Sequence, residues 1–260
     1  MRLIASRAFA VAILLAAGSG CPAQSQSLDQ RATLVTARER YYNLRKLGLS
    51  DIHAAIQPNW DVLLAGSGAA TSAKTTLNNL HFWITIDAAG QFMLSHDAKA
   101  LQPNQVSYAE TIFKDVNASV TGFFRTWSIF LLSSPFPEPG TNCAIDRLAN
   151  GYRFAQRQDD LDVVIETDND FAITEIRVSA PDRTSSLKPI LEKTPTGYML
   201  KGYSASSQAT NGSYTSIRAT LEYQTVNGLS LLHKVSLNTV FQGAPANFEW
   251  VFSDYQIKPR

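Results

Sequence analysis

One segment of the sequence approaches the G-x-S-x-G motif of serine hydrolases. In Gly202-Tyr203-Ser204-Ala205-Ser206, a serine stands where the motif has its second glycine. That glycine is required because the sharp strand-to-helix turn around the nucleophile leaves no room for a side chain. The residues that follow are polar and strand-like rather than helical. We therefore expect an ordinary strand end here, and the sequence predicts no serine nucleophile.

Metal ligands would come from histidines or clustered carboxylates. The four histidines are His53, His81, His96 and His233, and no two are spaced as on one helix or strand face. Acidic residues are dense between positions 159 and 170, but they lack the glycine and the final glutamate of a calcium loop. The sequence therefore predicts no metal and no cofactor. His233 is expected on the apolar face of a strand, as a core histidine.

The N-terminus has the pattern of a secretory signal peptide. Arg2 and Arg7 flank the start, an apolar run of ten residues fills positions 8–17, and small residues follow. The run is too short to cross a bilayer, which takes about 20 residues. Cleavage after Ala23 would place small residues at the −3 and −1 positions. The sequence therefore predicts a signal peptide over 1–23 and export to the periplasm or the extracellular space.

Cys21 allows a second interpretation of the same segment. Lipoprotein signals carry leucine three residues before the acylated cysteine, and Gly18 stands there in this chain, although Ser19 and Gly20 fit. Lipidation of Cys21 and a membrane anchor therefore stay open. If Cys21 leaves with the signal, Cys143 is the only cysteine and no intrachain disulfide can form. Cys143 is then expected to be a buried thiol or a quiet loop thiol rather than a nucleophile.

Composition indicates a globular protein. Of the 260 residues, 45% are hydrophobic and 17% are charged, which excludes a mainly disordered chain. The formal net charge is +1, without the basic excess or stripe of a nucleic-acid binder. We therefore expect no nucleic-acid partner.

Several helical regions are predicted among many strands, including short pieces from Pro58 to Leu64 and from Ser72 to Leu80. After a linker over 24–32, apolar residues recur at helical spacing from Thr33 to Leu47. A helical insertion over about 103–133 ends at a proline-rich loop, and Arg125 is the only charged residue between Ala118 and Leu132. Expected strands cover 52–57, 82–87, 91–96, 152–158, 161–167, 171–179, 197–203, 217–223, 231–241 and 248–252.

Short links between these strands predict antiparallel neighbours, and Asn227-Gly228 is a strong hairpin signal. The fold class is therefore α+β, mainly β. We expect a single domain over 33–260 with a curved, half-barrel-like antiparallel meander of about nine strands. An N-terminal helix accompanies this sheet, and helices cover its concave side.

The apolar helix carries the candidate binding residues, which form a wide aromatic stripe: Phe123, Phe124, Trp127 and Phe130. Three interpretations stay open. The stripe packs on the sheet as core, it acts as a plug or lid over an apolar cavity, or it docks on a membrane surface. The last is the weakest, because membrane docking favours a basic polar face and Arg125 is alone.

The chain resembles the periplasmic lipoprotein-carrier (LolA/LolB-like) superfamily. The resemblance covers roughly Tyr152 to Ile257 in shape, with one motif: Val226-Asn227-Gly228-Leu229-Ser230-Leu231-Leu232-His233-Lys234-Val235. It is similar to the hairpin v-x-G-l-x-L-P-x-x-i of that superfamily, although Leu232 stands where the pattern has proline. The resemblance implies a curved sheet stopped by helices and an apolar ligand, by fold-level analogy.

The leading functional hypothesis is a non-enzymatic cell-envelope protein that binds a lipid, acyl chain or lipoprotein between sheet and helix. In that case Trp127→Asp removes binding and leaves the sheet folded. The alternative is a structural or interaction protein with a self-filled core, which an exposed aromatic edge strand such as 248–252 would favour. An uncharacterised hydrolase is third. The oligomeric state is not predicted.

Overall fold

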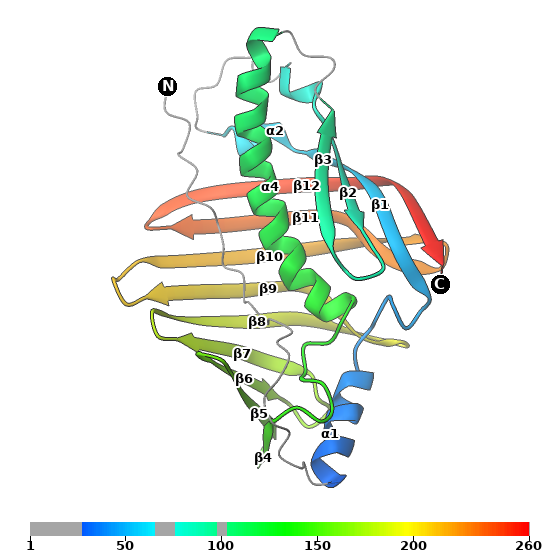
Figure 1. Cartoon of the computed structure of the whole chain (residues 1–260), viewed down its shortest axis with the longest axis vertical. Helices are drawn as coiled ribbons and strands as arrows, with labels where there is room; N and C mark the ends of the chain where they lie inside the picture. Colours follow the sequence, from blue (N-terminus) through cyan, green and yellow to red (C-terminus); the bar gives the residue numbers. More distant parts are fainter. Residues whose placement is uncertain (1–27, 66–75, 98–102, 260) are drawn as a thin grey trace.

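The computed structural model describes residues 28–65, 76–97 and 103–259. The predicted signal peptide and Cys21 lie outside these residues, and so does the linker up to residue 27. All the named strands join one antiparallel sheet of twelve strands, and helices lie against one of its faces (Figure 1). The fold class is α+β, mainly β, as the sequence predicts.

The sheet is built from strands of 5 to 16 residues. Their bounds are β1 (Leu49–Pro58), β2 (His81–Ile86), β3 (Phe92–Asp97), β4 (Ala144–Leu148), β5 (Gly151–Gln158), β6 (Leu161–Thr167), β7 (Ile173–Ala180), β8 (Arg183–Thr194), β9 (Gly197–Ala209), β10 (Tyr214–Val226), β11 (Leu229–Phe241) and β12 (Ala244–Pro259). The named helices are α1 (Leu28–Glu39), α2 (Trp60–Leu63) and α4 (Pro103–Leu131).

From β4 to β12 the chain forms an uninterrupted meander in which every strand pairs with the next. The first three strands join this meander at its far side, because β1 pairs with β12, with Ile56 opposite Phe252. The strand order therefore ends at β3 on one side and at β4 on the other. The two ends do not pair, so the sheet is open rather than closed into a barrel.

The core lies between the sheet and the helices. α4 is a single helix of 29 residues that crosses one face of the sheet, from the end that holds β1, β2 and β3 toward β8 and β9 (Figure 1). Its buried residues share a face and include Ile112, Val116 and Val120. They join one continuous hydrophobic cluster with inward-facing strand residues such as Leu221 and Trp250.

The first helix differs from its prediction. It spans 28–39 rather than 33–47, so residues 28–32, expected in a linker, are helical. After Arg40 the chain becomes extended, because Tyr198 N donates to Arg40 O (2.7 Å) and Tyr42 N donates to Tyr198 O (2.9 Å). Tyr41 and Leu44 are buried in this segment rather than on a helix. Their spacing therefore reflects burial in a loop.

The strand count was too low, because β4 and β8 were not predicted. β8 contains Pro189, which normally argues against a strand inside a sheet. Here Pro189 lies opposite Tyr203 of β9, whereas the pairing of β8 with β7 ends at Leu187. Pro189 therefore has no ladder partner on its β7 side. The missing backbone N–H of Pro189 therefore costs little free energy of folding at this position.

His233 is exposed rather than in the core, which corrects the sequence prediction. In the pairing of β10 with β11, Glu222 lies opposite Lys234 and Tyr223 lies opposite Leu232. His233 is therefore the extra residue of a β-bulge. A bulge breaks the two-residue alternation on which the prediction depended. As a result, both Leu231 and Leu232 are buried.

Candidate functional site

The four predicted ligand-binding residues lie on the face of α4 that meets the sheet. The exposed fractions of Phe123, Phe124 and Phe130 are 2% each, and that of Trp127 is 1%. Between ring centroids, Phe123 lies 6.1 Å from Trp250 and Phe124 lies 5.9 Å from Phe252. Phe130, one turn beyond Trp127, lies 6.4 Å from Tyr41. The structure therefore brings the stripe together against β12 and the segment after α1.

Little open space remains between α4 and the sheet. One cavity of about 20 Å³ lies beside Phe123, Tyr203 and Phe248, and another of about 10 Å³ lies beside Phe124, Trp127 and Tyr255. A single water occupies about 10–15 Å³ on this kind of measure. The interface is thus filled by side chains, and an acyl chain can enter only if α4 moves away from the sheet.

Buried tyrosines form the polar part of this interface. Tyr223 Oη donates to Leu200 O, and Tyr255 Oη donates to Leu232 O, each at 2.6 Å. Burial raises the pKa of both hydroxyls well above the usual tyrosine range. Trp127 Nε1 has no partner at hydrogen-bond geometry, although the indole lies near the Tyr223 hydroxyl and opposes the rise in the pKa of that hydroxyl. These groups are neutral at physiological pH and offer no general base.

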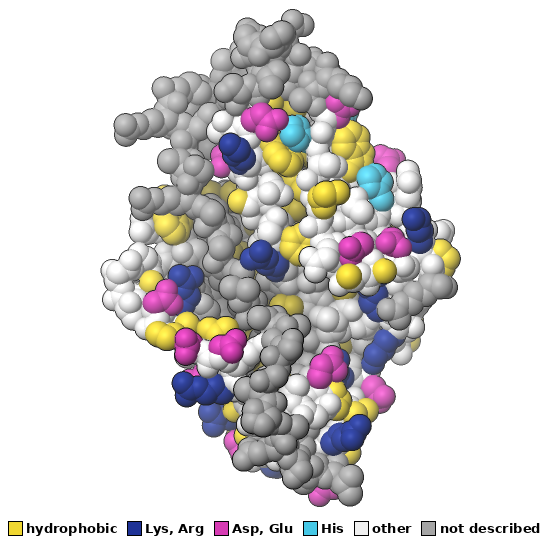
Figure 2. Space-filling model, viewed as in Figure 1, with side chains coloured by type: hydrophobic (Ala, Val, Ile, Leu, Met, Phe, Trp, Pro, Cys, Tyr) yellow, Lys and Arg dark blue, Asp and Glu magenta, His cyan; other side chains and the backbone are white. Residues whose placement is uncertain are grey.

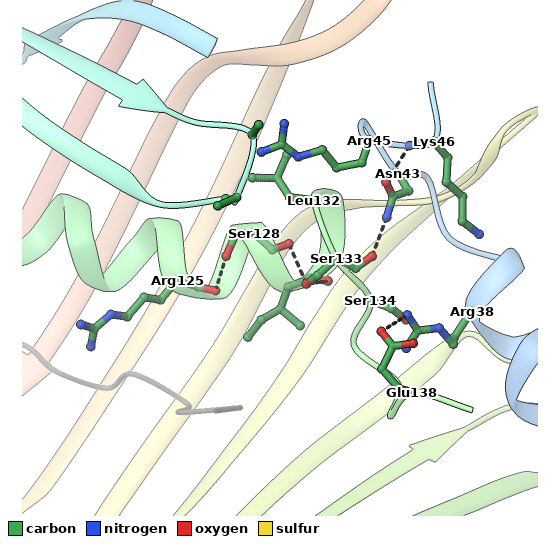
Figure 3. Close-up of a pocket in the computed structure, with 14 residues that line it drawn as sticks. Arg38, Asn43, Arg45, Lys46, Arg125, Ser128, Leu132, Ser133, Ser134 and Glu138 are labelled. Atoms are coloured by element: carbon green, nitrogen blue, oxygen red, sulfur yellow. Dashed lines mark hydrogen bonds and ion pairs between the residues drawn. The ribbon is translucent and has the colours of Figure 1, made fainter. Parts of the chain in front are cut away.

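A solvent-open hollow of about 700 Å³ lies on the other side of the last turns of α4 (Figure 3). Besides α4, four elements meet there: the end of α1, the turn between α1 and β1, the turn between β2 and β3, and the loop after α4. α4 contributes residues at helical spacing. The lining residues are Arg38, Asn43, Arg45, Lys46, Ala88, Ala89, Gly90, Arg125, Ser128, Ile129, Leu132, Ser133, Ser134 and Glu138.

A second hollow, of about 500 Å³, lies nearer the N-terminus of α4, between the helix and β3. Phe92, Leu94 and Phe113 supply its apolar wall, and Asn117 and Thr121 supply polar groups. Arg125 lines both hollows. From the sequence, Arg125 was only a lone charge on an apolar helix, because the hollows are formed by segments far apart in the sequence.

The other candidate residues lie apart from these hollows. Ser204 lies inside β9, which continues to Ala209, so it is neither a nucleophile elbow nor the expected strand end. No group of three or more potential metal ligands occurs in the described ranges. His96 stacks on Phe113, with 4.1 Å between the ring centroids, and lies 3.3 Å from the Glu110 carboxylate.

Cys143 is buried, as predicted, with 3% of its surface exposed. Burial raises the pKa of its thiol to about 11, so the reactive thiolate is scarce at neutral pH.

Comparison with known proteins identifies no relative. No family model, no curated protein and no solved structure matches this chain. Within the described ranges, none of the helices combines the length and the apolar character needed to cross a membrane.

Proposed function

We propose that this chain is a non-enzymatic cell-envelope protein that binds an apolar ligand between α4 and the sheet. The ligand is a lipid, an acyl chain or the acylated end of a lipoprotein. Binding displaces α4, so that Phe123, Phe124, Trp127 and Phe130 line the cavity that opens. Export and a possible lipid anchor on Cys21 belong to the same proposal, since both depend on the N-terminal signal.

The observation that carries this proposal is the way α4 is held. The helix covers the apolar face of an open sheet mainly through side-chain contacts. Among the described residues, the backbone hydrogen bond that joins α4 to another element lies at its last residue, from Leu44 N to Leu131 O (2.8 Å). Apolar contacts are non-directional, so the aromatic rings can pack against an acyl chain as they pack against the sheet.

The small cavities favour a second candidate, an interaction protein with a self-filled core. Spaces of about 20 and 10 Å³ hold no acyl chain, and the buried rings of α4 already fill the sheet face. On this alternative, α4 never leaves the sheet and the partner binds an outer surface.

The test is binding of a brominated fatty acid to residues 24–260, read by tryptophan fluorescence. Bromine quenches an indole only at close range, so a chain under α4 quenches Trp127 and Trp250, which are both buried there. Trp83, on the other face of β2, is half-buried and keeps its emission. Trp127→Phe should therefore lose a large share of the quenching, and Trp83→Phe should lose none.

Native mass spectrometry and lipid extraction of protein made in a bacterial periplasm complete the test. A lipid that co-purifies at fixed stoichiometry supports the proposal and identifies the ligand class. A clean apo mass, together with no quenching by added fatty acid, supports the self-filled interaction protein instead.

A further inference from the structure

One end of the sheet is a strand edge without a neighbour. β3 pairs with β2 on one side, and none of the other named strands lies on its free side. At the turn before β3, Asp87 N donates to Gln91 O (2.9 Å), so these two residues form a hydrogen-bonded pair. Such pairs alternate with non-hydrogen-bonded pairs along an antiparallel ladder. The backbone groups of Met93 and Ser95 therefore point toward β2.

The backbone N–H and C=O groups of Phe92, Leu94 and His96 consequently point to the free side of β3. No backbone hydrogen bond outside the strand ladders joins these groups to another described residue. A row of unpaired backbone groups on an edge strand is a template for pairing with another extended chain. The edge therefore offers three evenly spaced positions, each with one donor and one acceptor.

The two edges of the sheet differ in how they are protected. β4, at the other edge, has five residues and includes Asp146 and Arg147, both exposed. Short length and charged side chains are common ways to prevent an edge from pairing. β3 instead begins with three apolar residues, of which Met93 is 63% exposed. The first half of β3 thus lacks the protection that β4 has.

A groove runs along the free edge of β3. It is the hollow of about 500 Å³ beside α4, lined by residues 91–94 and by α4 residues at four-residue intervals, Phe113, Asn117, Thr121 and Arg125. From Phe113 to Arg125 the helix rises about 18 Å, which is the length of about five extended residues. Figure 1 shows α4 running alongside β3, and Figure 2 shows hydrophobic side chains exposed between them. The groove therefore has the length and the apolar character for one extended segment.

The position of α4 decides which kind of chain can occupy the edge. His96 stacks on Phe113 with 4.1 Å between ring centroids, and Phe92 lies 6.2 Å from Phe124, so α4 packs directly against the inner face of β3. Two copies that paired through β3 would each place α4 under the other copy's edge strand, where that copy's own α4 already packs. A single extended segment needs only one strand width, about 4.8 Å, and brings no helix with it.

The charged residues beside the edge give the segment a direction. β3 and α4 run in opposite directions, because the start of β3 contacts Phe124 and its end contacts Phe113. Arg125, an exposed cation, therefore lies near the start of β3, and the carboxylate of Glu110, 3.3 Å from His96, lies near its end. A strand antiparallel to β3 would place its carboxyl end toward Arg125 and its amino end toward Glu110, where the charges are complementary.

We propose that the free edge of β3 binds an extended peptide segment of a partner protein, which joins the sheet as a strand antiparallel to β3. Apolar side chains at alternate positions of the segment face α4, and an acidic group at its carboxyl end contacts Arg125. The inference goes beyond the proposed function and does not depend on a ligand under α4. It also assigns an outer surface to the alternative candidate, the interaction protein.

The first test is amide hydrogen exchange of the predicted mature chain, residues 24–260, followed residue by residue by NMR. In the free protein, the amides of Phe92, Leu94 and His96 should exchange roughly tenfold faster than those of Met93 and Ser95, which bond to β2. Equal protection of all five amides would show that the edge already has a partner, and would overturn the proposal. Protection that appears only as the protein concentration rises would assign the edge to a second copy instead.

The second test is the affinity of a fluorescein-labelled peptide, Lys-Val-Thr-Val-Ser-Val-Glu, measured by anisotropy. In the antiparallel register its valines lie opposite Phe92, Leu94 and His96 and bond to them, whereas its threonine and serine bond to nothing in the sheet. N-methylation of the valines should raise Kd roughly tenfold or more, and N-methylation of the threonine and the serine should change Kd little. Equal losses for both peptides, or no binding at about 1 mM peptide, would overturn the proposal.

Two tryptophan substitutions on α4 provide a matched pair in the protein. Thr121→Trp fills the groove and should abolish peptide binding, whereas Lys114→Trp lies on the same helix outside both hollows and should leave Kd unchanged. Arg125→Gln should raise Kd several-fold through loss of the charged contact. Wild-type affinity in Thr121→Trp would overturn the proposal, and if that variant fails to fold, the N-methylated peptides still decide. None of these measurements involves a lipid, so a negative result would leave the apolar ligand standing.

Discussion

At the scale of single residues, Gly197 shows how one position fixes the contact between two distant parts of the chain. Its φ is +122°, and a Cβ built there would lie 2.7 Å from Arg40 O and 2.8 Å from Tyr42 N. The close approach allows Tyr198 to exchange two backbone hydrogen bonds with the segment after α1. Glycine is therefore required at 197 both for its conformation and for the space.

Gly197→Ala is expected to lower the free energy of unfolding by about 2–4 kcal/mol, combining backbone strain with a steric clash. Gly212→Ala is the matched control, because Gly212 also has a positive φ, +82°, but nothing within 4 Å of a Cβ. Gly212→Ala should lower the free energy of unfolding only through backbone strain, by about 1 kcal/mol. Urea denaturation of both variants measures the difference, and equal losses would contradict the close approach.

Glu249 gives a prediction for pH dependence. Lys234 Nζ lies 2.8 Å from its carboxylate, and Asn59 Nδ2 donates to it at 2.8 Å. The hydrogen bond from Lys234, followed by that from Asn59, lowers the pKa of Glu249 below its ordinary value. A lowered pKa in the folded state adds stability above the unfolded pKa, and this stability is lost as pH falls through the folded pKa.

Glu249→Gln should therefore lower stability at pH 7 and have progressively less effect as pH falls below about 4, where the wild-type carboxylate also becomes protonated. Urea denaturation at pH 7 and at pH 3 measures this. Asp162→Asn is the control, since its contact with Arg157 is 3.9 Å long and exposed, and such pairs contribute little. A constant difference between wild type and Glu249→Gln at both pH values would refute the assignment.

At the scale of elements, sequence periodicity predicted the long apolar helix and most of the sheet. The stripe on α4 was predictable because its rings recur at helical spacing and the proline-rich loop ends the helix. Periodicity could not reveal the bulge at His233 or the strand around Pro189, because both depend on pairing with neighbours. The hollow beside Arg125 could not be predicted either, since its lining comes from three stretches that are far apart in the sequence, 38–46, 88–90 and 125–138.

Trp127 tests how much α4 contributes to stability. With 1% of its surface exposed, its truncation leaves a large cavity under the helix. Trp127→Ala should lower the free energy of unfolding by about 3–5 kcal/mol, whereas Trp83→Ala, at a half-buried site, should cost clearly less. Chemical denaturation compares the two. Trp127→Asp would also bury a charge. The sequence alone predicted that this variant loses binding and keeps a folded sheet, but the burial of Trp127 now predicts that it destabilises the whole fold.

At the scale of the whole molecule, β12 joins two parts of the sheet. It pairs with β11 on one side and with β1 on the other, from Leu49 opposite Pro259 to Pro58 opposite Trp250. Removal of residues 244–260 would leave β1, β2 and β3 without a neighbour in the meander. The truncated chain should therefore fail to unfold cooperatively, and β1, β2 and β3 should become sensitive to protease.

A synthetic peptide covering 244–259 offers the complementary test. If β12 acts only as a connecting strand, the added peptide should restore a protease-resistant core at concentrations above its Kd. Failure of the peptide, with a truncated chain that stays folded, would show that the β1–β3 unit is held by α4 alone.

The pairing of β1 with β12 also determines when β1 can join the sheet during biosynthesis. Ribosomes release a chain from its N-terminus, so β1 emerges first and its sheet neighbour β12 emerges last among the described strands. Until then the apolar side chains of β1, such as Ile52 and Ile56, have no place in the meander. The newborn chain must therefore keep its leading segment from aggregating until synthesis is almost finished, which makes it a natural client for a holding chaperone.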